Sequence, residues 1–449
     1  MQENQVNPKD KKVGSDLRKK VVNLSEEFQF VNSILKYLGW KKSLLKESKV
    51  FCMAPWIQLH AQTNGHVAPC CMADAWDGRE TGNLNEDANL SQQWNSPKMR
   101  QLRLNMLAGK ESSICGNCYK YESLGKLSER NTYNRYYCRY LSRLFITDKE
   151  GRLDTDSIPL IDLRFSNKCN YKCRICNSEY SSLWYEDELK VGNYYGNQPL
   201  KLKSMTTKMD DLWRSLDSQL ATVKRIHFAG GEPLYMDEHY TVLEKLLALG
   251  NNKAVLSYNT NFSTLKYKNY DVVKIWKKFE SVHIWASLDG MGEKGNYQRK
   301  GQRWNKIEEN ILEIQQKCPH VLFGVNVTVS IFNIFDVMDF YQYMVTENFV
   351  KPERMNLYLL FSPECFSIAQ LTPGLKKRAM EKIDSFLKNE LPRIPNSSNF
   401  RNHLESARRY MLSKEPTHQL ELKDRIQKVD EVREEKFLEL FPELAELLI

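Results

Sequence analysis

The sequence has no run of about 18 consecutive apolar residues, the length that a membrane-spanning helix needs. Its first residues, MQENQVNPKDKK, lack the apolar core and the small-residue cleavage site of a secretory signal. Internal repeats, low-complexity tracts, a Ser-His-Asp constellation and a phosphate-binding glycine loop are also missing. We therefore expect a cytoplasmic protein without membrane contact, kept in a thiol-reducing compartment.

Cysteine is scarce, because 11 residues in a chain of 449 are too few for a disulfide scaffold of this length. The cysteines are also unevenly placed, with nine of them between Cys52 and Cys176. Grouped cysteines in a reducing compartment bind metal or do redox work more often than they form structural bridges. This grouping is the most informative feature of the composition.

The rest of the composition, with 41% hydrophobic and 27% charged residues, is that of an ordinary globular protein. The length favours two or three domains, or one large barrel with additions. More than half of the net charge of +9 lies in the first fifty residues, which carry eleven Lys or Arg against six acids. This basic stretch is typical of a solvated arm; an arm that binds nucleic acid or another acidic partner is the alternative.

The chain divides into four predicted segments. Residues 1–48 form the basic arm with a short amphipathic helix from about 23 to 46, and residues 49–150 form a small cysteine-rich domain. Long apolar periodic runs are rare in 49–150, which favours a metal site as the element that holds this domain together. Residues 155–365 form the main α/β domain, and residues 366–449 form a charged helical extension.

Short apolar runs alternate with helical stretches through the main domain. Such alternation is typical of buried parallel strands in β/α units. Six units fit a partial (β/α)6 barrel of the TIM type better than a complete eight-stranded barrel. The predicted strands are 158–165, 225–229, 254–259, 281–288, 321–329 and 355–361.

The first predicted strand is followed by a CxxxCxxC loop made of Cys169, Cys173 and Cys176. Three thiolates at this spacing can hold three irons of a 4Fe-4S cluster and leave the fourth iron without a protein ligand. A zinc site would need a nearby fourth Cys or His, which the neighbouring residues do not offer. Catalytic residues of β/α barrels lie at the carboxyl ends of the strands, where this loop is expected.

Further motifs follow the next three predicted strands in order: GGEP at 230–233, YNTN at 258–261 and SLDG at 287–290. The two glycines of GGEP let backbone approach closely, and the proline fixes the turn. Together with the cysteine loop, these motifs resemble the radical S-adenosylmethionine (SAM) superfamily over residues 155–365. The residues that the resemblance implies in SAM binding are Gly230, Gly231, Glu232, Pro233, Asn259, Ser287, Asp289 and Asn326.

The resemblance implies a radical SAM enzyme whose catalytic cluster is held by the CxxxCxxC loop. In that superfamily the reduced cluster cleaves SAM to methionine and a 5'-deoxyadenosyl radical, which abstracts hydrogen from the substrate. The implied substrate is a peptide or a small molecule, and the implied electron donor is a flavodoxin or a ferredoxin. Many members carry an aromatic residue at the position of Ile175, so we expect adenine packing from Phe361 or Tyr358 instead.

A second cysteine pattern precedes residue 120, with Cys-x12-Gly-x4-Cys from 52 to 70 and CGNC at 115–118. It resembles SPASM and twitch domains, which carry auxiliary iron-sulfur clusters, although here it stands ahead of the barrel. The resemblance implies one auxiliary 4Fe-4S cluster for electron transfer, with the ligands Cys52, Cys70, Cys115 and Cys118. Cys71 is an alternative to Cys70, and a four-cysteine zinc site is an alternative to the cluster.

Two alternative functions explain fewer of the motifs. An RNA-modifying radical SAM enzyme would use the basic arm, but no RNA-binding module is recognisable, so nucleic acid is not an expected partner. A non-catalytic iron-sulfur or zinc scaffold would not need the SAM motifs. Packing or capping roles, rather than roles in the active site, are expected for the remaining polar candidates, which are His60, His66, Glu122, Ser128 and Arg130.

Overall fold

The computed structural model of the chain describes residues 39, 41–74, 78–123, 125, 127–192 and 198–448. The basic arm and most of the predicted helix between 23 and 46 lie outside the described residues. At the end of that stretch, Ser43–Glu47 forms a short π-helix, η1.

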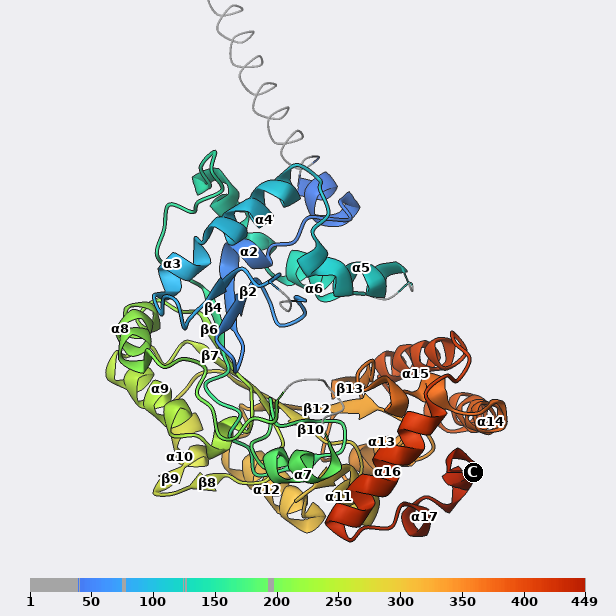
Figure 1. Cartoon of the computed structure of the whole chain (residues 1–449). Coiled ribbons are helices and arrows are strands. Elements are labelled where there is room, and N and C mark those ends of the chain that lie inside the picture. The colour runs from blue at the N-terminus through green and yellow to red at the C-terminus, as the bar shows by residue number, and fades with distance from the viewer. Residues whose placement is uncertain are drawn as a thin grey trace, which may run out of the picture.

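A nine-stranded sheet organises the fold, in the spatial order β13-β12-β10-β7-β6-β4-β1-β2-β3 (Figure 1). The six strands from β4 to β13 in this order are parallel to one another and follow the chain order. Each falls within one residue of a predicted strand or inside it. They are β4 (Leu160–Leu163), β6 (Arg225–Phe228), β7 (Val255–Thr260), β10 (Val282–Ser287), β12 (Leu322–Val329) and β13 (Met355–Leu359). The fold is therefore α/β with a large parallel sheet.

The cysteine-rich segment adds three strands to the same sheet: β1 (Gln58–Ala61), β2 (His66–Ala68) and β3 (Gly82–Asn83). Strand β1 runs parallel to β4, and β2 and β3 follow as antiparallel neighbours. Apolar side chains of this segment, including Trp56 and Trp94, belong to the same buried cluster as the apolar residues of the parallel strands. The segment is thus packed directly onto the main sheet.

Helices join the strands and flank the sheet (Figure 1). In the first part of the chain they are α2 (Ala54–Ile57), α3 (Leu90–Trp94), α4 (Pro97–Leu107), α5 (Gly116–Ser123) and α6 (Glu129–Tyr136). Between the parallel strands they are α7 (Trp184–Val191), α8 (Met209–Leu220), α9 (Asp237–Ala248), α10 (Val272–Trp276), α11 (Gly292–Gln298), α12 (Trp304–Lys317) and α13 (Val337–Thr346). After β13 they are α14 (Pro373–Asn389), α15 (Ser398–Met411), α16 (Gln419–Arg433) and α17 (Phe437–Leu440).

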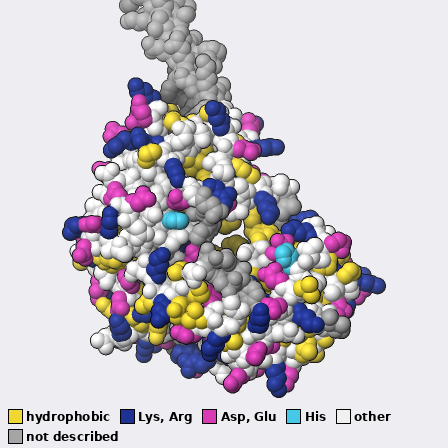
Figure 2. All heavy atoms as spheres, viewed as in Figure 1, with side chains coloured by type: hydrophobic (Ala, Val, Ile, Leu, Met, Phe, Trp, Pro, Cys, Tyr) yellow, Lys and Arg dark blue, Asp and Glu magenta, His cyan; other side chains and the backbone are white. Residues whose placement is uncertain are grey.

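Shorter elements complete the description. Two-stranded ribbons pair β5 (Lys172–Cys173) with β11 (Arg299–Lys300), and β8 (Lys266–Tyr267) with β9 (Tyr270–Asp271). The 3-10 helices are η2 (Ser113–Cys115), η3 (Cys138–Ile146), η4 (Pro233–Tyr235), η5 (Pro352–Arg354), η6 (Glu364–Phe366), η7 (Ile368–Gln370), η8 (Leu391–Arg393) and η9 (Pro442–Leu447). In the part of the chain that the structure describes, no helix is both long and apolar enough to cross a membrane. On the face shown in Figure 2, basic and acidic side chains are interspersed with hydrophobic ones.

The two faces of the parallel sheet differ in polarity, because successive side chains of a strand point to opposite faces. One row of register partners is apolar and buried, and it includes Ile226, Leu256 and Val282. The next row lies on the opposite face and is polar; its members are His60, Asp162, His227, Ser257 and His283. The hydrogen-bonding side chains of these strands are thus gathered on one face of the sheet, and several of them bind one another there.

Candidate functional site

The CxxxCxxC loop lies between β4 and α7 and carries three partly buried free thiols. Burial, and after it the neighbouring Cys173 and Glu232, raise the pKa of the Cys169 thiol well above its ordinary value. Burial and then Cys173 raise the pKa of Cys176 to about 12. These thiols lie close enough to repel one another as thiolates. A bound cation or cationic cluster would therefore displace their protons as it binds.

The GGEP segment is bonded to the backbone just ahead of Cys169. The amide of Gly231 donates to Ser166 O at 3.0 Å, and the amide of Glu232 donates to Lys168 O at 2.8 Å. A Cβ atom on Gly231 would lie 2.1 Å from Lys168 O, so no side chain fits at that position. The glycines thus serve the close approach of two backbone segments, one of which leads into the cysteine loop.

Glu232 is buried, and its carboxylate ties the GGEP segment to the end of β7. It accepts hydrogen bonds from Thr260 Oγ1 at 2.6 Å and from the amide of Asn261 at 2.7 Å. A third bond comes from the amide of Leu234 at 3.0 Å, where Pro233 begins η4. Burial raises the pKa of this carboxyl to about 7, although these hydrogen bonds favour the ionised form. Both carboxylate oxygens are therefore engaged by the protein itself.

Three of the predicted SAM-binding residues share the polar face near the carboxyl ends of the strands. Ser287 and Asn326 are register partners, and Asn326 Nδ2 lies 3.5 Å from Asn259 Oδ1. The next strand adds Asn356, whose Nδ2 donates to Asn326 Oδ1 at 3.1 Å. Asn356 was not predicted from the sequence, although the alternation of polar and apolar residues in β13 could have placed it on this face.

Asp289 lies elsewhere in the hydrogen-bond network. It is 3% exposed, accepts a hydrogen bond from the amide of Thr328 at 2.7 Å and pairs with Arg299 Nε at 2.7 Å. Arg299 Nη1 in turn donates to Cys173 Sγ at 3.7 Å. Asp289 thus holds a buried cation against one thiol of the cysteine loop. No sequence signal singled out Arg299, since its partner Cys173 is more than one hundred residues away.

The four thiols predicted in the N-terminal block line one cavity. Cys52 precedes α2, Cys70 follows β2, Cys115 ends η2 and Cys118 lies in α5. Apolar side chains make up most of the remaining wall; they are Ala54, Pro55, Pro69, Met72, Ala73, Met106 and Ile114. Cys71 does not line this cavity and is exposed. The structure thus brings together the four cysteines of the predicted set.

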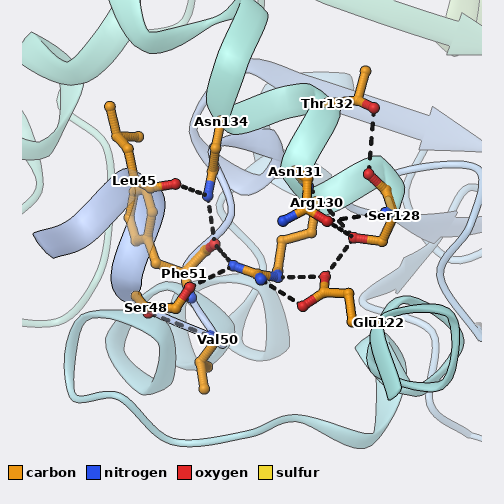
Figure 3. Close-up of polar contacts among 10 residues, drawn as sticks. All are labelled: Leu45, Ser48, Val50, Phe51, Glu122, Ser128, Arg130, Asn131, Thr132 and Asn134. Carbon is orange, nitrogen blue, oxygen red and sulfur yellow. Dashed lines mark hydrogen bonds and ion pairs between the residues drawn. The ribbon is translucent and has the colours of Figure 1, made fainter. Parts of the chain in front are cut away.

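Arg130 stands beside this cavity as the centre of a hydrogen-bond network (Figure 3). Its guanidinium forms a two-pronged pair with Glu122, at 2.9 Å and 2.6 Å, and donates to the carbonyls of Ser48 and Phe51. Ser128 caps α6 and also donates to Glu122. These contacts indicate packing and capping roles for Glu122, Ser128 and Arg130. The network fixes the backbone next to Cys52.

The polar row of the sheet contains groups that sequence reasoning assigned no role in binding. His60 Nδ1 pairs with Asp162 Oδ2 at 2.8 Å, and both side chains are almost fully buried. Burial opposes ionisation of Asp162, yet His60, His227 and Arg164 lower its pKa well below its ordinary value. His60 Nε2 has no hydrogen-bond partner among the described residues, whereas Asp162 Oδ1 lies 3.9 Å from Arg164 Nε in a longer ion pair. Buried polar atoms of this kind are candidates for contacts with a ligand.

Other residues from the sequence analysis are placed as follows. Phe361 packs edge-on against Tyr121 and Tyr410, while Tyr358 is half exposed. Among the described residues, no three His, Cys, Asp or Glu side chains converge closely enough to hold a single metal ion.

Residues 52–119 match the model of the SPASM family, described as an iron-sulfur cluster-binding domain. The match spans all four thiols of the N-terminal cavity and confirms the iron-sulfur domain predicted there. No curated protein matches the chain.

Solved structures that are similar to the chain have low identities. "Native anSMEcpe with bound AdoMet" is 20% identical, covers 51% of this chain and 61% of that chain, and has a TM-score of 0.35. "Crystal structure of Streptococcus suis SuiB bound to precursor peptide SuiA" is 14% identical, covers 68% and 63%, and has a TM-score of 0.34. "Structure of TYW1 with a lysine-pyruvate adduct bound" is 12% identical, covers 47% and 70%, and has a TM-score of 0.27. The chain thus spans about 60% of the length of the first of these proteins.

Proposed function

We propose that this protein is a radical SAM enzyme that abstracts hydrogen from a peptide or a small-molecule substrate, with an auxiliary 4Fe-4S cluster for electron transfer. The observation that carries the proposal is the bonding of the GGEP backbone to the segment that leads into Cys169. It unites two motifs from different β/α units into one site at the carboxyl ends of the strands. In the proposed organisation, residues 155–365 form a partial (β/α)6 barrel, 49–150 the auxiliary domain and 366–449 a helical extension.

The residues of the loop fit a SAM-binding 4Fe-4S cluster. Cys169, Cys173 and Cys176 are free thiols, and three thiolates leave one iron open to SAM. When bound, the cluster supplies the electron that cleaves SAM and so provides the 5'-deoxyadenosyl radical that abstracts hydrogen from the substrate.

The chain's own part in this chemistry is to position groups and exclude water. Asn259, Ser287 and Asn326 would offer amide and hydroxyl groups to the polar portions of SAM from the polar face of the sheet, on which they are neighbours. Arg299 donates to Cys173 Sγ and so places a positive charge next to the cluster. The carboxylates of Glu232 and Asp289 bind backbone amides and Arg299, and we assign them the positioning of these segments rather than direct contact with SAM.

The N-terminal cavity fits an auxiliary cluster because it offers four thiols within apolar walls. Four thiolates complete the coordination of a 4Fe-4S cluster, which favours electron transfer over substrate binding. We assign Cys70 rather than Cys71 as the ligand, since only Cys70 lines the cavity. The substrate would lie on the polar face of the sheet, where the buried His60 Nε2 has no hydrogen-bond partner among the described residues.

Anaerobic reconstitution of the full chain tests both cluster assignments. We expect about eight irons per chain, from two four-iron clusters, with matching sulfide. Cys169→Ala should lower this to about four and abolish the formation of 5'-deoxyadenosine from SAM. Cys118→Ala should remove about four irons and leave the SAM-binding cluster in place.

The outcomes separate the alternatives. Four irons with one zinc would assign zinc to the N-terminal site. No cleavage of SAM by the reduced wild-type protein would refute the enzyme and leave the iron-sulfur scaffold. The proposed electron donor is tested by replacing the chemical reductant dithionite with a reduced flavodoxin or ferredoxin and measuring the cleavage of SAM.

A further inference from the structure

The helix α16 lies outside the motifs discussed so far, yet it packs against α7, which directly follows the cysteine loop. In Figure 1 the red helix α16 crosses the lower part of the molecule beside α11 and α7. Three separate contacts join α16 and the turn after it to the cysteine loop.

The first contact is an ion-pair network around Arg174, which lies between two of the cysteines. Its side chain is 1% exposed and pairs with Asp430 of α16 and, at 2.6 Å, with Glu435. Its guanidinium carbon lies 3.5 Å from the ring centre of Tyr297, whose hydroxyl donates to Asp430 at 2.8 Å. The amide of Arg174 donates to Gln298 O at 2.8 Å. Both the side chain and the backbone of this residue are therefore fixed.

The second contact is carried by Arg433, the last residue of α16. Its Nε pairs with Asp187 of α7 at 2.7 Å, and Asp187 also pairs with Lys172 at 2.8 Å. The guanidinium of Arg433 lies over Trp184, whose indole N–H donates to Cys173 O at 2.8 Å. This chain of contacts reaches the backbone of a cysteine of the loop.

The third contact is apolar. Trp184, Val191 and Val429 form a small buried cluster of their own, separate from the main core. Cys176 and Val432 pack against this cluster. Since Val429 and Val432 both belong to α16, the helix covers one side of the third cysteine of the loop.

We propose that α16 is a positioning element for the SAM-binding cluster loop, with Arg174 as its anchor. A buried guanidinium without its carboxylates is unfavourable, so the loop conformation that buries Arg174 depends on Asp430 and Glu435. The apolar contact with Cys176 keeps water from that side of the loop. The C-terminal extension thereby acts on the spacing and the environment of Cys173 and Cys176. The cluster assignment itself rests on the proposed function.

The first test uses the full-length apoprotein and the thiols alone. In the double variant Asp430→Asn/Glu435→Gln, alkylation of Cys173 and Cys176 by N-ethylmaleimide, read by peptide mass spectrometry, should be at least about tenfold faster than in the wild type. Cys52 and Cys118 report on the fold of the rest of the chain and should react at the wild-type rate. Asp424→Asn removes an exposed pair with Lys428 on the same helix and serves as the matched control.

Rates within about twofold of the wild type in the double variant would overturn the proposal. Equal acceleration at all cysteines would mean that the double variant is generally unfolded. In that case Arg174→Lys, which keeps the buried charge, decides the question. Its alkylation rate must lie between those of the wild type and the double variant, at Cys173 and Cys176 alone, or the proposal fails.

A second test uses the reconstituted protein and spectroscopy. We expect Arg174→Lys to keep about eight irons but to change the EPR spectrum and the midpoint potential of the SAM-binding cluster, with the auxiliary cluster unchanged. An unchanged spectrum and potential would contradict the positioning role. If the wild type holds only the auxiliary cluster, the proposed function fails, while the alkylation rates still decide whether α16 positions the loop.

Discussion

Replacing Arg130 by Met tests how the auxiliary site is held together. The Arg130 side chain is 6% exposed, and Glu122, its partner, is 21% exposed. Removing one partner from a buried ion pair costs about 3–5 kcal/mol, because the other charge and its acceptors are left unsatisfied. Here the groups left behind are the Glu122 carboxylate and the carbonyls of Ser48 and Phe51. We expect this loss to fall on the backbone around Cys52.

Hydrogen-deuterium exchange of the apoprotein measures the effect locally. A loss of about 3 kcal/mol or more corresponds to exchange at least about 100-fold faster, since each 1.4 kcal/mol is a factor of about ten. The amides to follow are those of Val50, Phe51 and Met53, which donate to side chains of this network. Iron binding by the auxiliary site should weaken in parallel.

Two controls sharpen the Arg130 experiment. Arg135→Met removes an exposed guanidinium from the same helix and should leave the exchange rates unchanged. Burial opposes ionisation of Glu122, but hydrogen bonds from Arg130 and Ser128 lower its pKa, so the pair stabilises the fold above the ordinary Glu pKa of about 4.3. That stability is lost as the pH falls through the lowered pKa, and the difference between wild type and Arg130→Met should shrink there. A change below about threefold at neutral pH would refute the reasoning.

Three further predictions concern the other parts of the site. Gly231→Ala places a Cβ 2.1 Å from Lys168 O and should prevent the SAM-binding cluster from assembling, whereas Gly116→Ala, with open space at its Cβ, should keep the iron content of the wild type. Asp162→Asn removes the charge of the carboxylate that binds His60, and it should lower the free energy of unfolding in urea at pH 7 by about 1.5–3 kcal/mol. Burial lowers the pKa of His60, so at pH 7 this contact is a hydrogen bond from a neutral imidazole to a carboxylate. Because the pKa of Asp162 is lowered, the difference should fall off below about pH 3.9, and a pH-independent difference would contradict an ionised acceptor. Removing iron with a chelator should increase amide exchange in the cysteine-rich domain, since the free energy of metal binding stabilises the folded state.

The parallel sheet could be predicted because each of its strands has a local signal. A run such as 321–329 is apolar at six of its nine positions, and the helix after it has its own periodicity. The attachment of the cysteine-rich segment could not be predicted in the same way. Strand β1 has the sequence QLHA, which is too short and too mixed to be recognised, and its pairing with β4 joins residues about one hundred positions apart. Such a pairing leaves no periodic pattern in the sequence.

The site residues also divide into those with a local sequence signal and those that depend on distant contacts. Cysteine and glycine were recognised because their chemistry allows few substitutes at a given spacing. The residues that hold them in place, such as Arg299 and Asp430, are ordinary charged residues whose partners lie far away in the chain. Asp289 was predicted to bind SAM from the resemblance alone; its contacts in the structure, with the amide of Thr328 and with Arg299, join residues that no local pattern connects.

The pairing of β1 with β4 also decides how the two cysteine groups are related. Cys169 follows β4 and so lies beyond the carboxyl end of that strand, whereas Cys52 precedes β1 and lies toward its amino end. Cys70 follows the antiparallel β2, which returns toward the same amino end. Because β1 and β4 are parallel neighbours, the two cysteine groups lie toward opposite ends of this pair of strands. The polar pair His60 and Asp162 lies between them. A strand of four residues spans only about 13 Å, so a substrate on the polar face would have one cysteine group on either side.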